Sequence, residues 1–364
     1  MAVFTTTTII TAIGVFLAGL LTLAERFLLN YGICKIVVNG EKTYEIKGGN
    51  HLLGSLQQHD IFIPSACGGR GTCGLCKVAV LEGGGPLLPT ETPYLTAEEI
   101  ENHFRLSCQV RVRNDLNILI PEELFSIREY HAKVIRIKDL TYDTKYLSLG
   151  LAEGETVDFV AGQYIQLMIP TYGKVKEEVY RAYSVASPQT LKTQIDLIIR
   201  RVPQGISTTY VFDYLKEGDS ITFNGPYGDF FLRDNSREII YIAGGSGLGP
   251  IKSMLHKMAE EGIDRKATFF FGCVSEKDLY FVDEMKEFED RVPKFKFVPA
   301  LSNPEANDGW QGETGLITEV VDRHIKEDGE YEAYLCGSPG MIDASIKVLK
   351  SKGIPEEHIF FDKF

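Results

Sequence analysis

Four cysteines have the spacing of ligands for an iron–sulfur cluster. Cys67, Cys73 and Cys76 lie in the run Ala-Cys-Gly-Gly-Arg-Gly-Thr-Cys-Gly-Leu-Cys, and Cys108 follows later in the chain. Three thiolates in one tight loop and a fourth from a distant strand fit a [2Fe–2S] cluster, whose plant-type spacing is C-x4-C-x2-C and a distant C. The first gap here is five residues. The sequence therefore predicts a cluster that carries single electrons.

The residues around these cysteines argue against two other uses of a cysteine group. Gly68, Gly69, Gly71 and Gly74 let the loop wrap closely around inorganic sulfide and turn its N–H groups inward. Zinc sites are the main alternative, but they usually pair two short Cys/His spacings. Disulfides fit poorly, because the rest of the chain has the motifs of a cofactor enzyme in a reducing compartment.

A second set of residues has the chemistry of a flavin site. Arg181, Tyr183 and Ser184 follow an expected strand and offer a cation for phosphate, a flat ring and a hydroxyl for a ring nitrogen. Downstream, the turn at Gly205 leads into Ser207 and Thr208 at an expected helix start, which is a suitable anion site. Each motif is weak alone, but their order along the chain makes them reinforce one another.

Two glycine turns have the form of a dinucleotide site. The loop Gly244-Gly245-Ser-Gly247-Leu-Gly249-Pro lies between a strand and a helix, so its backbone can approach a pyrophosphate. It is not a G-x-G-x-x-G fingerprint, and dinucleotide binding is not argued from that pattern. Cys336-Gly337 repeats the arrangement at the end of another strand, where ligands of α/β sheets bind. We expect Cys336 to line the nicotinamide pocket; a buried core thiol is the alternative.

The segment Ser275–Asp278 predicts a preference for NADH over NADPH. It follows a strand and carries two carboxylates and one lysine, with no arginine to pair with a 2′-phosphate.

The pattern of strands and helices divides the chain into three folded domains. Residues 33–125 are expected to form a ferredoxin-like α+β domain of the β-grasp kind, with a hairpin turn at Asn39-Gly40. Residues 126–232 show regular short strands, which are typical of an antiparallel β-barrel. Residues 237–364 alternate strands with helices, one of them expected at Ile317–His324, and predict a doubly wound α/β domain with a parallel sheet.

The N-terminal segment is expected to anchor the chain in a membrane. Residues 2–24 carry no charge and suffice to span a bilayer, so residues 1–26 are predicted to form a transmembrane helix. A secretory signal peptide is the alternative, but a basic start and a clear cleavage site are lacking. Arg26 and Lys35 follow the span and favour a cytoplasmic side for the remainder of the chain.

The composition limits the kinds of partner that this protein can bind. The 364 residues carry a formal charge of −12, which argues against nucleic acid as a partner. The apolar content of 44% and charged content of 24% are ordinary for globular protein.

Taken together, the flavin and nucleotide motifs and the terminal aromatic Phe364 resemble the ferredoxin-NADP reductase superfamily. With the ferredoxin domain and the N-terminal helix in front, the chain is similar to the F-subunit family of Na⁺-translocating NADH:quinone reductases. The resemblance implies FAD in the barrel, with Tyr183 against the isoalloxazine, Ser184 near its N5, and Arg181 and the Gly205–Thr208 turn at its pyrophosphate. It further implies that Phe364 stacks on the other flavin face, where nicotinamide must displace it.

The resemblance implies an NADH dehydrogenase component at the bacterial inner membrane, with its folded domains in the cytoplasm. Electrons would run from NADH through FAD and the [2Fe–2S] cluster to other subunits of a membrane redox complex and finally to quinone. The chain departs from that family because only Thr171–Tyr180 stands where a long insertion is usual. Sodium translocation is therefore not assumed from this chain.

Two other interpretations remain open. The reductase component of a multicomponent oxygenase has the same three domains in the same order, but is generally soluble and uses the four-residue cysteine gap. The second interpretation is a membrane-anchored ferredoxin whose downstream domains are degenerate. Intact flavin and nucleotide motifs weigh against it.

Overall fold

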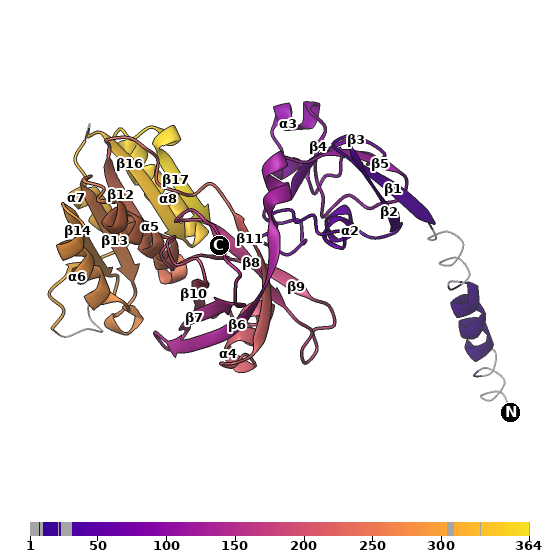
Figure 1. Cartoon of the computed structure of the whole chain (residues 1–364), viewed down its shortest axis with the longest axis horizontal. Coiled ribbons are helices and arrows are strands. Elements are labelled where there is room, and N and C mark those ends of the chain that lie inside the picture. The colour runs from indigo at the N-terminus through magenta and orange to yellow at the C-terminus, as the bar shows by residue number, and fades with distance from the viewer. Residues whose placement is uncertain are drawn as a thin grey trace. The chain divides into compact units, whose positions relative to one another are not determined.

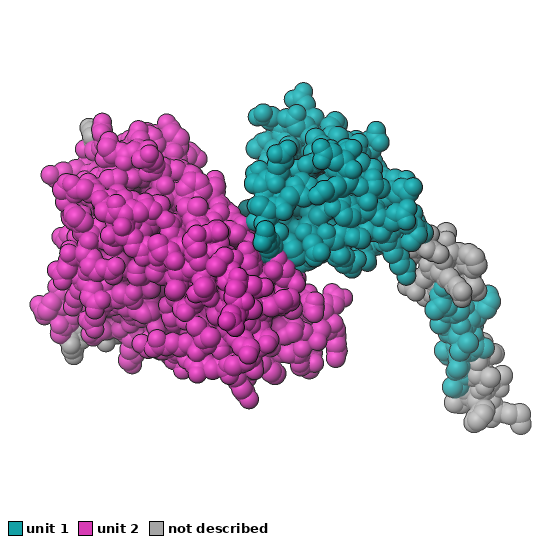
Figure 2. Space-filling view, viewed as in Figure 1, with its two compact units in different colours: residues 1–128 teal, residues 129–364 magenta. Residues whose placement is uncertain are grey.

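A computed structural model describes residues 7, 10–20, 22, 31–303, 309–327 and 329–363. The chain divides into two units, Met1–Arg128 and Glu129–Phe364, which are coloured separately in Figure 2. Each unit has its own hydrophobic core.

The helical segment at residues 10–20 has its large apolar side chains on the surface. Ile10, Val15 and Phe16 are each about two-thirds exposed. Thr11 and Thr22 donate hydrogen bonds to carbonyl oxygens one turn earlier, so their hydroxyls are satisfied within the helix. Within the described residues, the structure contains no helix that is long and apolar enough to cross a membrane. The predicted span at residues 2–24 includes residues outside that description and stays a prediction.

The first unit has a mixed sheet with the strand order β2-β1-β5-β3-β4 (Figure 1). Asn39 and Gly40, with φ of 53° and 69°, form the predicted hairpin turn between β1 and β2. β1 and β5 run parallel, and the apolar side chains of the sheet pack with those of helix α2. The elements are β1 (Ile33–Val38), β2 (Lys42–Lys47), α2 (Leu52–Gln57), β3 (Lys77–Glu82), α3 (Ala97–Glu101), β4 (Phe104–Leu106) and β5 (Leu116–Leu119). The expected ferredoxin-like α+β architecture is thus present.

The second unit begins with a six-stranded antiparallel sheet of order β10-β7-β6-β11-β8-β9. The six strands form a half-barrel, whose two end strands meet at an isolated bridge between Val185 and Leu197, so the expected antiparallel β-barrel is confirmed in part. The elements are β6 (Arg128–Asp139), β7 (Thr144–Leu151), β8 (Tyr164–Ile169), β9 (Val179–Ser184), β10 (Gln194–Arg200), α4 (Ile206–Asp213) and β11 (Ser220–Tyr227).

The same unit continues with a parallel sheet of order β15-β14-β13-β12-β16-β17, as predicted for a doubly wound domain. Alternate residues of β12 face opposite layers: Tyr241 packs in the cluster that contains α5 and α6, and Ile242 packs in the cluster that contains α7 and α8. The elements are β12 (Glu238–Gly244), α5 (Leu248–Glu261), β13 (Ala267–Cys273), α6 (Val282–Arg291), β14 (Phe295–Leu301), β15 (Glu313–Thr314), α7 (Ile317–His324), β16 (Tyr331–Gly337), α8 (Pro339–Ser351) and β17 (Ile359–Lys363).

The strand order reverses between β12 and β16, which are parallel neighbours. Successive strands after β12 extend the sheet to one side, whereas β16 and β17 lie on the other (Figure 1). The chain leaves β12 and β16 toward helices on opposite layers of the sheet, α5 and α8. Doubly wound sheets bind ligands at the carboxyl ends of such strands.

Candidate functional site

The four predicted cluster cysteines lie together in the first unit as two pairs. Sγ of Cys73 lies 3.4 Å from Sγ of Cys67. Cys76 begins the approach to β3, Cys108 follows β4, and these two thiols also interact with each other. Cys76 and Cys108 are buried, whereas Cys67 and Cys73 are half-buried, and all seven cysteines of the chain are free thiols.

Each pair of thiols titrates as a unit. The hydrogen bond between Cys73 and Cys67 lowers the pKa of Cys67 and raises that of Cys73. The contact between Cys76 and Cys108 acts in the same way, lowering the pKa of Cys108 and raising that of Cys76. Two neighbouring thiolates repel unless a cation lies between them, so four deprotonated cysteines here require bound metal.

The paired arrangement fits a binuclear cluster better than a single metal ion. A tetrahedral zinc site needs four donors around one centre. A [2Fe–2S] cluster held by four cysteines takes two thiolates on each iron, and the two pairs Cys67/Cys73 and Cys76/Cys108 match that requirement.

The cluster loop has the backbone that its glycines predict. Gly68, Gly69, Gly71 and Gly74 all have positive φ, between 65° and 81°. A Cβ at Gly71 would lie 2.5 Å from Nε2 of Gln109, so the Gln109 amide would have to move away. The loop thus brings three cysteines close together only because these positions lack side chains.

The predicted flavin residues lie within β9, not after a preceding strand as expected. Their side chains alternate across the strand. The Tyr183 hydroxyl lies 2.6 Å from the Ser207 hydroxyl at the start of α4. On the opposite side of the strand, Ser184 Oγ donates to Asp362 on β17 at 3.2 Å. Arg181 lies on the same side of the strand as Tyr183, and its guanidinium donates to the Tyr180 carbonyl.

The turn at Gly205 forms the start of helix α4, as predicted. Backbone bonding in this helix begins with Thr209 N donating to Gly205 O, which leaves the N–H groups of residues 206–208 at the helix end. The Thr208 hydroxyl is already used, because it bonds to both the N–H and the carbonyl of Val202. An anion at this helix start would therefore meet the N–H of Thr208 and not its hydroxyl.

The two predicted nucleotide loops touch each other at the switch point of the parallel sheet. Gly247 approaches the Cys336–Gly337 peptide so closely that a Cβ on it would lie 2.1 Å from the Cys336 carbonyl oxygen. Gly244 and Gly249 flank this contact at the end of β12 and the start of α5. The Cys336 side chain is fully buried, and burial raises its pKa well above the ordinary range.

Asp362 is a site residue that sequence reasoning missed. It lies in register with Cys336 on the neighbouring strand and accepts the hydrogen bond from Ser184. Desolvation raises the pKa of its carboxyl to about 6, although the residue as a whole is only half-buried. Its sequence signal was its place two residues before the terminal Phe364, which itself lies outside the described residues.

Tyr280 was also missed, and no motif marked it. Its hydroxyl donates to the carbonyl oxygen of Gly245 at 2.5 Å and its ring is buried. This bond fixes the orientation of the peptide that follows Gly245 in the nucleotide loop. The neighbouring Phe281 has φ of 55°, a strained value for a bulky residue. Its ring packs edge-on against Tyr280 and Tyr146.

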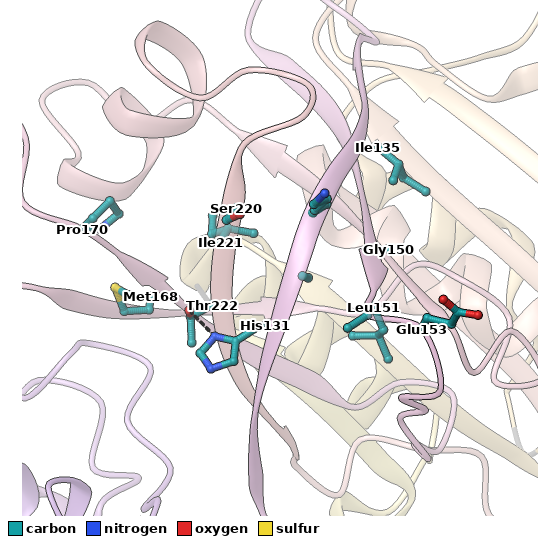
Figure 3. A pocket seen from close by; sticks show the side chains of 13 residues that line it. His131, Ile135, Gly150, Leu151, Glu153, Met168, Pro170, Ser220, Ile221 and Thr222 are labelled. Atoms are coloured by element: carbon teal, nitrogen blue, oxygen red, sulfur yellow. Dashed lines mark hydrogen bonds between the residues drawn. The ribbon is translucent and has the colours of Figure 1, made fainter.

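A cavity of about 560 Å³ lies beside β6, β7, β8 and β11 in the half-barrel (Figure 3). Its rim includes His131 and Thr222, whose side chains are 3.2 Å apart. Within the described residues, its lining contains none of the predicted site residues. We therefore place the functional site at the cofactor motifs and not at this cavity.

Three family profiles match the chain in succession. Residues 36–113 match the 2Fe-2S iron-sulfur cluster binding domain, residues 131–232 the oxidoreductase FAD-binding domain and residues 241–347 the oxidoreductase NAD-binding domain.

Relatives in sequence match the chain over nearly its whole length. The F subunit of the Na⁺-translocating NADH-quinone reductase of Neisseria meningitidis (strain MC58) is 37% identical over 396 positions, covering 97% of each chain. The corresponding F subunit of Pseudomonas aeruginosa is 34% identical and covers 97% of this chain. Because 396 aligned positions exceed the 364 residues present, the Neisseria relative contains residues without a counterpart here.

Solved structures with the same architecture include a cytochrome P450 reductase and the ferredoxin reductase of a dioxygenase. The alignment with the cytochrome P450 reductase GcoB of Amycolatopsis covers 91% of this chain and 98% of GcoB. Its TM-score is 0.73 and the sequence identity is 28%. The alignment with the ferredoxin reductase in carbazole 1,9a-dioxygenase covers 92% of this chain and 98% of the reductase. Its TM-score is 0.70 and the sequence identity is 28%.

Replacement of any one of the four paired cysteines by alanine is expected to abolish the EPR signal of the reduced cluster. The FAD content should stay unchanged, because the flavin motifs lie in the other unit. Cys34→Ala, which removes a buried thiol away from the loop, is the matched control and should keep the signal. Stoichiometric zinc without iron in anaerobically purified wild-type protein would contradict the assignment.

Asp362→Asn is expected to stabilise the protein at pH 7.5 and to slow NADH oxidation. The pKa is raised from 3.8 to about 6, so the folded state binds the proton more tightly than the unfolded state. Stability is therefore lost as pH rises from about 4 to about 6, and the ionised carboxylate opposes folding at neutral pH. Two pKa units correspond to roughly 3 kcal/mol, and partial exposure reduces this to about 1–2 kcal/mol.

Thermal unfolding and turnover at pH 5 and pH 7.5 measure both effects of this variant. The gain in Tm should shrink at pH 5, where the wild-type carboxyl is protonated. Turnover is expected to fall, because the carboxylate beside Ser184 would stabilise the positive charge that develops on a nicotinamide bound at this edge of the sheet. A Tm difference that is the same at both pH values contradicts the shifted carboxyl.

Tyr280→Phe is expected to raise KM for NADH by about 2- to 10-fold with kcat nearly unchanged, because one hydrogen bond of about 0.5–1.5 kcal/mol to the nucleotide loop is lost. Steady-state kinetics with ferricyanide as the acceptor measure it. Tyr44→Phe, in the first unit, is the control and should leave KM unaltered. An unchanged KM in Tyr280→Phe means that the loop does not need this bond.

Proposed function

Since the chain belongs to the F-subunit family of Na⁺-translocating NADH-quinone reductases, we propose that it is the NADH-oxidising component of a membrane redox complex. FAD and a [2Fe–2S] cluster are its cofactors, and quinone is the final acceptor of the complex. The observation that carries this proposal is the presence of cluster, FAD and NAD domains in one chain that is 37% identical to the Neisseria F subunit over 97% of its length.

The arrangement of residues supports a division of roles in the second unit. Arg181 and the start of α4 would hold the FAD pyrophosphate, with Tyr183 and Ser184 beside the flavin ring. When bound, FAD accepts a hydride's two electrons and releases them singly, and the cluster accepts one electron at a time. The protein supplies alignment: Ser184 and Asp362 link the flavin strand to the sheet that carries the nucleotide loops.

The residues proposed for NADH surround the switch point. The N–H groups of the Gly244–Gly249 loop and the start of α5 would receive the pyrophosphate, as helix starts favour anions. Cys336 and Gly337 would border the nicotinamide, and Phe364 would cover the flavin until NADH arrives. Ser275–Asp278, where Asp278 already accepts hydrogen bonds from Ser275, would face the ribose and favour NADH.

The N-terminal segment is proposed to attach this protein to the cytoplasmic side of the bacterial inner membrane. Residues 2–24 carry no charge, and residues 10–20 expose six large apolar side chains, each about half or more exposed. So many exposed apolar side chains on one short helix favour burial against lipid or another subunit. Neither sodium translocation nor the identity of the other subunits follows from this chain.

The reductase component of an oxygenase is the second candidate, because GcoB and the carbazole dioxygenase reductase share the fold over most of the chain. Both are 28% identical, against 37% for the F subunit of Neisseria. The N-terminal segment distinguishes the two functions, because the reductase components of oxygenases are generally soluble.

Removal of residues 2–24 is expected to leave NADH oxidation with ferricyanide intact and to abolish NADH-driven quinone reduction in membranes. The cofactor motifs all lie beyond residue 60, so the catalytic part should remain complete, while attachment to the next electron carrier is lost. Both activities are measured on full-length and shortened protein at equal FAD content. Full-length protein that stays soluble and supports hydroxylation by a soluble oxygenase would favour the second candidate.

A further inference from the structure

Ser107 carries a buried hydroxyl without a protein partner beside the cluster cysteines. The residue is fully buried, and its Oγ has no hydrogen-bond partner among the described residues. Buried hydroxyls are normally satisfied, because leaving one unpaired costs folding free energy. An orphan of this kind next to metal ligands points to a partner that arrives with the metal.

The backbone of Ser107 is held on both sides. Its N–H donates to the Cys76 carbonyl at 2.8 Å, and its own carbonyl accepts from Leu53 N at 3.1 Å. The side chain is thereby kept next to Cys76, with which it is in contact.

The Gln109 side chain supplies a second donor to the same pair of cysteines. Nε2 of Gln109 lies 3.7 Å from Cys108 Sγ, and its Oε1 accepts from the Thr90 hydroxyl, which fixes which end of the amide faces the sulfur. Ser107 and Gln109 therefore flank Cys108 in the sequence. Ser107 lies beside Cys76, and Gln109 lies beside the Cys108 thiol.

We propose that the Ser107 hydroxyl donates a hydrogen bond to the Cys76 thiolate of the assembled cluster and thereby raises its reduction potential, with Gln109 acting in the same direction at Cys108. A reduced cluster carries one more negative charge than an oxidised one. A donor aimed at a ligand sulfur stabilises the reduced form more and favours electron uptake. Ser107 is thus a positioning and tuning residue, and it does not touch NADH or FAD.

The test is a potentiometric titration of the full-length protein, followed by the EPR signal of the reduced cluster. Ser107→Ala should lower the ratio of reduced to oxidised cluster at a fixed potential by about 2- to 10-fold, the upper value corresponding to a 59 mV lower midpoint. Iron content and the visible spectrum should match the wild type. Bleaching of the flavin by NADH should stay unchanged, because the flavin motifs lie in the other unit.

A matched pair of variants separates the hydroxyl from the space that it fills. Ser107→Thr keeps the donor and adds a methyl group, while Ser107→Val has the same shape without the donor. A midpoint that is lower in Ser107→Val than in Ser107→Thr supports the proposal, as does a cluster that forms with Thr but not with Ala or Val. Equal midpoints in all variants with full iron content overturn it, and so does loss of the cluster in all three.

This inference rests on the cluster of the proposed function, and the experiment distinguishes the two failures. Wild-type protein without an iron-dependent EPR signal would refute the cluster itself. A normal wild-type signal with a midpoint that does not respond to Ser107 would refute only the role of the hydroxyl.

Discussion

The contact between the half-barrel and the parallel sheet is the interaction on which the second unit depends. Ser184 on β9 and Asp362 on β17 are 178 residues apart in sequence and 3.2 Å apart in space. Hydride transfer needs the donor carbon and the flavin ring in contact, so the strand with the flavin motif must meet the edge with the nucleotide loops. The protein maintains this contact at a cost, because Asp362 is an acid in a partly desolvated place.

The nucleotide side of this contact is built from close approaches of backbone to backbone. Gly247 touches the Cys336 peptide, and Tyr280 holds the Gly245 carbonyl. Neither feature binds a ligand by itself. Together they set the direction of the N–H groups at the switch point before any nucleotide arrives, and preorganisation of this kind lowers the cost of binding. The first unit uses the same strategy, since the glycines of its loop bring the thiols into pairs.

Local patterns predicted those elements that form from neighbouring residues. The Asn39-Gly40 turn and helix Ile317–His324 appear as expected, because turn chemistry and helical periodicity are properties of short segments. Strand β9 was missed because all its residues are half-buried, so it lacks an alternating pattern. Helix α3 had a visible signal in the Thr96/Glu99 capping box that was not used. Asp362 was marked only by its place beside the predicted Phe364. Tyr280 and Ser107 were beyond reach, because their importance comes from partners far along the chain or from a cofactor.

The proposed cofactor content makes one quantitative demand on the protein. FAD stores two electrons and the cluster one, so full reduction requires three electrons, or about 1.5 equivalents of NADH per chain. An anaerobic titration of the purified full-length protein with NADH, followed by flavin absorbance and cluster EPR together, measures this directly. The account predicts that both signals respond and that the end point lies at about 1.5 equivalents. A flavin that bleaches at one equivalent while the cluster stays oxidised would contradict it.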